Sequence, residues 1–88
     1  MNREKITDEQ VKGAIHLLTT AIAFRLQEKG DGTFASRHEI AGVIVEEYDE
    51  MLEALRSNNG TDFRNELIDI AVACVFGVAC MDAKKVDW

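Results

Sequence analysis

Residues 46–55 read EEYDEMLEAL, and residues 66–71 read ELIDIA. Each segment sets two acids three residues apart among apolar residues that recur at helical spacing. The pairs are Glu47 with Glu50 and Glu66 with Asp69. Residues three apart on a helix lie about 60° from each other, so both carboxylates of a pair can address one point. The pattern predicts two helices that turn acids toward the protein core.

Apolar periodicity extends outward from these segments and predicts an all-α chain of antiparallel helices. The helices are expected at about residues 8–29, 36–56 and 62–83. Two capping boxes start the first two helices: Thr7 with Gln10, and Ser36 with Glu39. For the third helix, Thr61 or Asp62 can supply the cap. We expect residues 1–88 to form one domain.

Composition excludes several classes of protein. The chain has 88 residues, 16 acids against 10 Lys and Arg, and a net charge of −6. No basic block is present to neutralise duplex phosphates, so a nucleic-acid partner is not expected. The longest apolar run, residues 67–81, is interrupted by Asp69 and is shorter than the roughly 20 residues of a membrane-spanning helix. Neither a membrane partner nor a secretory signal is indicated, and we expect a cytoplasmic protein.

The third helix is apolar on nearly every side between residues 67 and 81. Two other helices of this length can cover only part of the apolar surface of the third helix. We therefore expect a homo-oligomer, either a dimer or a dimer of dimers. Ala73, Gly77 and Cys80 form a strip of small residues where another helix could approach closely. Cys74 and Cys80 lie on one helix in positions that cannot pair, which fits free thiols in a reducing compartment.

The four acids on inward faces require cations, because a buried unpaired carboxylate is costly. Arg25 and Lys12 could reach inward, but two cations cannot neutralise the whole cluster. Hard divalent cations can, and a ligand set without His or Cys favours Mg²⁺ or Mn²⁺ over zinc or copper. The alternative is that these acids are ordinary surface charges of an acidic helical protein.

The two acidic segments resemble the E-E-x-x-E and E-x-x-D motifs of the MazG-like all-α nucleoside triphosphate pyrophosphohydrolases. The resemblance covers about half of the chain, in compact form. It implies that Glu47, Glu50, Glu66 and Asp69 bind Mg²⁺ and that Glu46 is a supporting carboxylate or a base. It also implies assembly as a dimer or tetramer.

The implied reaction is Mg²⁺-dependent hydrolysis of a (d)NTP to a (d)NMP and pyrophosphate, with water attacking the α phosphorus. Glu46 or Glu47 would take the proton from the water. Four cationic residues are candidates to bind the phosphates: Lys12, Arg25, Lys84 and Lys85. Three aromatic residues are candidates to stack on a base: Phe24, Phe34 and Trp88. The alternative function is a non-catalytic helical dimerisation or adaptor module with a vestigial metal site.

Overall fold

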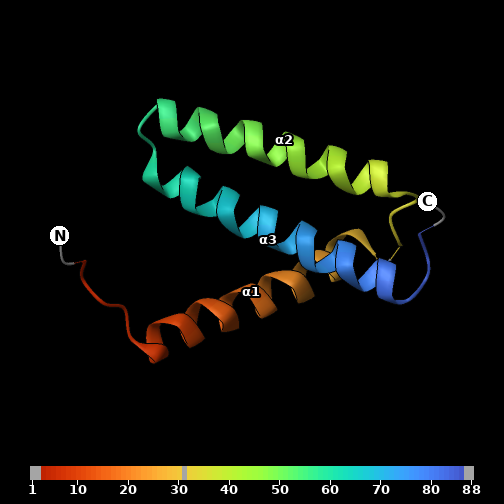
Figure 1. Cartoon of the computed structure of the whole chain (residues 1–88), viewed down its shortest axis with the longest axis horizontal. Helices are drawn as coiled ribbons and strands as arrows, with labels where there is room; N and C mark the ends of the chain where they lie inside the picture. The colour runs from red at the N-terminus through yellow and green to blue at the C-terminus, as the bar shows by residue number, and fades with distance from the viewer. Residues whose placement is uncertain (1–2, 31, 87–88) are drawn as a thin grey trace.

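The computed structural model describes residues 3–30 and 32–86 and contains the three predicted helices. They are α1 (Asp8–Lys29), α2 (Arg37–Arg56) and α3 (Gly60–Asp82). α2 and α3 form an antiparallel hairpin, and α1 crosses α3 at an angle (Figure 1). Within the described residues α1 packs on α3 rather than on α2. The all-α prediction and the interhelical packing are confirmed.

Local side-chain caps explain where α1 and α2 begin. The Thr7 hydroxyl accepts a hydrogen bond from the Gln10 backbone N–H at 3.2 Å, and the Gln10 side chain accepts from the Thr7 N–H at 2.8 Å. This is the predicted capping box. At α2, Ser36 accepts from the Glu39 N–H at 3.1 Å, whereas the Glu39 side chain reaches the N–H of Ala35. Ser36 is therefore the cap residue, and α2 begins one residue after the predicted start.

The predicted cap of α3 was wrong. Asn59 caps the helix, and its side-chain oxygen accepts from the Asp62 N–H at 3.0 Å. The Asn59 amide also donates to the Asp62 carboxylate at 2.8 Å. Asn is as good a cap as Thr or Asp, and this one comes earlier in the chain, so α3 begins at Gly60 rather than near residue 62. The helix ends at Asp82, and Ala83 is its C-cap residue.

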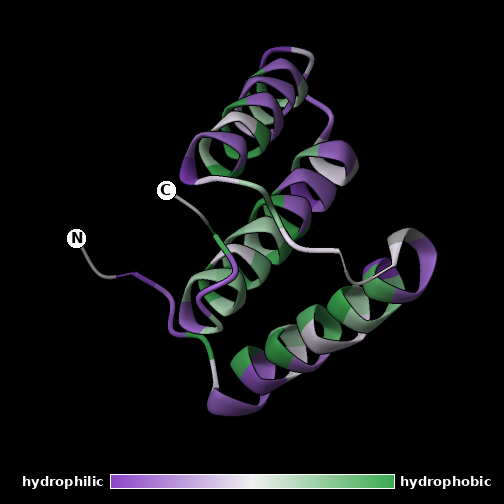
Figure 2. Cartoon of the chain, turned by 90° about the vertical axis from the view of Figure 1, so that its right-hand side faces the viewer, coloured by the Kyte–Doolittle hydropathy of each residue, from purple (hydrophilic) through white to green (hydrophobic). Residues whose placement is uncertain are grey.

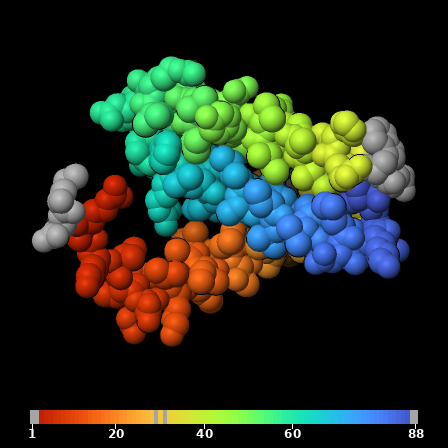
Figure 3. All heavy atoms as spheres, viewed as in Figure 1, coloured from red at the N-terminus to blue at the C-terminus, as the bar shows by residue number. Residues whose placement is uncertain are grey.

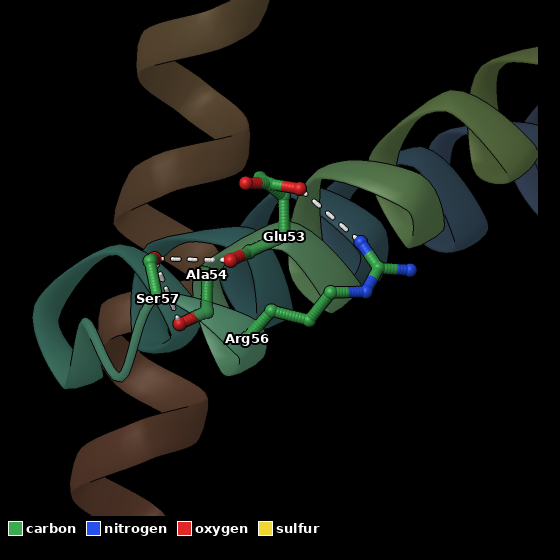
Figure 4. Close-up of polar contacts among 4 residues, drawn as sticks. All are labelled: Glu53, Ala54, Arg56 and Ser57. Carbon is green, nitrogen blue, oxygen red and sulfur yellow. Dashed lines mark hydrogen bonds and ion pairs between the residues drawn. The ribbon is translucent and has the colours of Figure 1, made fainter.

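The end of α2 is held by local polar contacts (Figure 4). The Ser57 hydroxyl donates to the backbone oxygens of Glu53 and Ala54 at 3.0 and 3.3 Å. Arg56 pairs with the Glu53 carboxylate at 3.2 Å, and both side chains are exposed. An exposed pair three residues apart contributes only about 0.3–0.5 kcal/mol, so Glu53 is a solvated surface charge.

The tightest packing lies between α2 and α3, along the strip of small residues. Ala73, Gly77 and Cys80 are buried. A Cβ added at Gly77 would lie 3.1 Å from Cγ2 of Ile40, so the absence of a side chain lets α2 approach. The strip therefore serves a contact within this chain. In contrast, no large side chain among the described residues is completely buried.

None of the described helices combines the length and the apolar character needed to span a membrane.

Candidate metal centre

Three carboxylates meet where the middle of α2 lies beside the first half of α3. They belong to Glu47 of α2 and to Glu66 and Asp69 of α3, and one oxygen from each lies within 4.8 Å of the others. Glu66 and Asp69 share a face because they are three residues apart on one helix. The antiparallel hairpin brings that face to Glu47. We call these three residues the acidic triad, and they could hold a metal ion.

Two oxygens of the acidic triad are out of contact with water and unpaired. Glu47 Oε2 and Glu66 Oε2 are buried, and neither has a hydrogen-bond partner in the described part of the chain. A carboxylate oxygen desolvated in this way costs free energy unless a proton or a cation approaches it. Carboxylate oxygens without His or Cys nitrogen or sulfur are the ligands that Mg²⁺ and Mn²⁺ favour. The donor set therefore fits a hard divalent cation.

Mutual repulsion within the site is visible in two pKa values. The pKa of Glu66 is raised from its ordinary value of 4.5, first by the adjoining Glu47 carboxylate with which it can share a proton, then by burial and by the charges of Glu47 and Asp69. The pKa of the exposed Glu50 is raised chiefly by the negative charge of Glu66. Both carboxyl groups resist ionisation in the absence of a cation, so positive charge is favoured here.

Arg25 of α1 supplies one positive charge. Its guanidinium Nη2 donates to Oδ1 of Asp69, and the two side chains are 35% and 23% exposed. Of the two cations predicted to reach inward, Arg25 does so, and Lys12 lies exposed about 20 Å from it along α1. Among the residues that the structure describes, no cation contacts the unpaired oxygens of Glu47 and Glu66.

A mainly apolar pocket of about 230 Å³ adjoins the acidic triad. Glu47, Asp69 and Arg25 all contribute to its lining. Its walls also contain Phe34 and Phe76, whose rings lie edge to face with centroids 5.4 Å apart. Phe34 was predicted from the sequence as a candidate to stack on a base, and Phe76 was not. The signal was present, because Phe76 follows Asp69 by seven residues and therefore lies on the same face of α3.

The remaining predicted site residues lie outside the acidic triad. Glu46 and Glu50 are exposed on α2, one residue before and three residues after Glu47. Lys84 and Lys85 are exposed beyond the end of α3, whose last residue, Asp82, lies about 20 Å from Asp69 along the helix axis. Their phosphate-binding role stays a prediction, as does that of Lys12. Phe24 is exposed, and Trp88 is outside the described residues.

Comparisons with protein families, with curated proteins and with solved structures gave no match to this chain. They identify no family, and the MazG-like resemblance rests on the two acidic motifs. The chain is an all-α three-helix domain with a cluster of three acids that could hold a metal.

Proposed function

We propose that this protein is a Mg²⁺-dependent nucleotide pyrophosphohydrolase that converts a (d)NTP to a (d)NMP and pyrophosphate. The observation that carries the proposal is the pair of buried, unpartnered oxygens of Glu47 and Glu66 within 4.8 Å of an Asp69 oxygen. Such an arrangement destabilises the protein unless a proton or a cation occupies it. A cation bound there would remove this cost when the carboxylates are ionised, which supports metal-dependent chemistry.

The acidic triad would hold Mg²⁺, with Glu50 beside it. Bound there, Mg²⁺ would neutralise phosphate charge and lower the pKa of a water molecule that attacks phosphorus. Glu46 is exposed next to Glu47 and is the proposed acceptor of the water proton. An exposed carboxylate can pass that proton on to solvent, which suits a base that must be regenerated in each turnover.

The pocket supports a nucleotide as the substrate. Its volume of about 230 Å³ is below the roughly 300–1,000 Å³ of pockets that enclose a whole drug-sized ligand, so it suits part of a nucleotide. The apolar walls with Phe34 and Phe76 favour a base. Arg25 lines the same pocket and contacts Asp69 of the acidic triad. Its planar guanidinium is suited to binding phosphate oxygens in this position.

A panel of NTPs and dNTPs with Mg²⁺ tests the proposal through release of pyrophosphate. Glu47→Gln and Asp69→Asn keep side-chain size but remove charge from the acidic triad, and each is expected to lower turnover by at least about 100-fold. Asp49→Asn is the matched control, since Asp49 is an exposed acid on the same helix. No turnover by the wild type with any nucleotide, or equal loss in the control, would remove the proposal.

The alternative function, a non-catalytic dimerisation or adaptor module, is favoured by a different observation. Twelve large apolar side chains of the described residues are exposed. Where such side chains form a contiguous apolar patch, they mark an interaction site. The same nucleotide panel separates the two functions, because an adaptor gives no pyrophosphate while still binding a protein partner.

A further inference from the structure

Arg25 is the residue through which α1 reaches the acidic triad. It lies near the end of α1, where this helix packs on α3, whereas the first half of α1 leaves the surface of the hairpin (Figure 3). Hydrophobic residues run through the middle of α1 and hydrophilic residues lie at its ends (Figure 2). Among the described side chains, the hydrogen bond from Arg25 to Asp69 is the one polar link between α1 and α3.

Under the proposed function, Asp69 has to serve two cations. It would bind a divalent cation together with Glu47 and Glu66, yet Arg25 already neutralises it. A Mg²⁺ ion lies only about 2.1 Å from each oxygen that binds it, so an ion held by the acidic triad would lie close to the Arg25 guanidinium. Two positive charges so close together repel each other. A bound cation also cancels the negative charge that attracts Arg25, and both effects favour the departure of Arg25 from Asp69.

The Arg25 side chain is free to change partner. It is 35% exposed, and it lines the same pocket as Glu47 and Asp69. In the described part of the chain it donates one hydrogen bond, from Nη2, rather than the two parallel bonds of a bidentate pair. The other N–H groups of the guanidinium are therefore available to phosphate oxygens that enter the pocket.

We propose that Arg25 is an internal counter-ion that competes with the metal for Asp69 and, once displaced, binds the phosphates of the substrate, an assignment that rests on the proposed function. In the metal-free protein Arg25 neutralises one acid of the acidic triad. In the metal-bound protein it exchanges that carboxylate for a phosphate. Arg25 gains its phosphate partner only after it leaves Asp69, so the metal binds before the substrate or together with it.

Titration with Mn²⁺ alone, in about 0.1 M salt and followed by electron paramagnetic resonance of the free ion, tests the competition without a nucleotide. Arg25→Gln removes the competitor and is expected to tighten Mn²⁺ binding at least about tenfold. An arginine that only positions Asp69 gives the opposite sign, because the loss of a partner of a metal ligand weakens metal binding by about 10–100-fold. Mn²⁺ binding by Arg25→Gln that is equal to or weaker than that of the wild type would overturn the proposal.

Arg56→Gln is the matched control. It makes the same change in net charge and breaks the ion pair with Glu53. Arg56 lies about 14 Å from Glu47 along the axis of α2, beyond the Debye length of about 10 Å at 0.1 M salt. Its Kd for Mn²⁺ is expected to stay within about twofold of the wild type. Equal tightening in both variants would show a general effect of net charge and would overturn the proposal.

Inorganic pyrophosphate tests the second partner, because it carries the phosphate oxygens without a base. In the presence of Mg²⁺, calorimetry is expected to show pyrophosphate binding to Arg25→Gln at least about tenfold weaker than to the wild type, since a charged hydrogen bond is lost. Tighter metal binding and weaker pyrophosphate binding from one substitution distinguish an exchange from misfolding, which weakens both. Unchanged pyrophosphate binding would overturn the proposal.

NMR of the wild-type chain does not depend on the folding of a variant. The guanidinium protons of Arg25 are expected to exchange with water slowly in EDTA and at least about tenfold faster in Mg²⁺, because the bond to Asp69 is broken. Exchange that Mg²⁺ leaves unchanged, in a protein that binds Mn²⁺ and releases pyrophosphate from a nucleotide, would overturn this proposal alone. Failure of the wild type to bind Mn²⁺ would overturn both this proposal and the proposed function.

Discussion

Glu66→Gln is expected to stabilise the metal-free protein and to remove its stabilisation by Mg²⁺. Two unit charges 4.8 Å apart repel by about 3 kcal/mol at an effective dielectric constant of 20. The carboxylates are only partly buried, so solvent screening reduces the net gain from removing one charge to about 1 kcal/mol. For a domain of this size, 1 kcal/mol corresponds to about 4–8 °C in Tm.

Thermal unfolding followed by circular dichroism, in EDTA and in Mg²⁺, measures both effects. In EDTA the variant is expected to melt about 4–8 °C above the wild type. In Mg²⁺ at about 100 times Kd, the free energy of unfolding of the wild type rises by about 2.7 kcal/mol and that of the variant rises little. The wild type is then expected to melt above the variant. Asp49→Asn should stay within about 0.5 kcal/mol of the wild type in both conditions. Lower stability of Glu66→Gln in EDTA would show that the charge of Glu66 does not destabilise the metal-free site, and a Mg²⁺ shift equal to that of the wild type would show that Glu66 does not bind the ion.

Three further predictions follow from single contacts and charges. Because the pKa of Glu66 is raised in the folded state, the metal-free protein should lose stability as pH rises from about 4.5 through that pKa. This group contributes at most about 1.4 kcal/mol per pH unit to the loss. A series of Tm values in EDTA measures the slope, and a Tm that rises over this range would contradict the prediction. Asn59→Ala should lower the free energy of unfolding in urea by about 1 kcal/mol, because Asn59 caps α3, and Thr61→Ala should lower it by less than about half of that. A larger loss from Thr61→Ala would show that Thr61 is the cap. Gly13→Ala should stabilise the protein by about 0.5–1 kcal/mol, because a Cβ at this position meets nothing within 4 Å. Gly77→Ala should give no gain, because its Cβ would lie 3.1 Å from Cγ2 of Ile40 on α2. Equal gains from the two variants would contradict the close packing of α2 on α3.

The sequence predicted the helices well because their signals are local. Thr7 with Gln10 and Ser36 fixed two helix starts, and apolar periodicity fixed the lengths. The start of α3 was predicted about two residues late because Asn59, Thr61 and Asp62 are all good caps, and sequence alone does not rank them.

The site was predicted only in part, because it depends on how helices that are far apart in the sequence pack on one another. The i, i+3 spacing showed that Glu66 and Asp69 share a face, and the short turn implied that α2 lies against them. That Arg25 reaches Asp69 depends on the crossing of α1 over α3, which periodicity does not determine. The segment between α1 and α2 brings Phe34 against Phe76, and the packing of α2 on α3 leaves Glu50 outside the acidic triad.

The most direct test of the proposed function is phosphorus NMR of the products formed from a nucleoside triphosphate with Mg²⁺. Cleavage next to the α phosphorus gives a nucleoside monophosphate and pyrophosphate, and we expect these two products from the wild type and their loss in Glu47→Gln. Formation of a nucleoside diphosphate and inorganic phosphate, or no product with any nucleotide, would rule out the proposed pyrophosphohydrolase function.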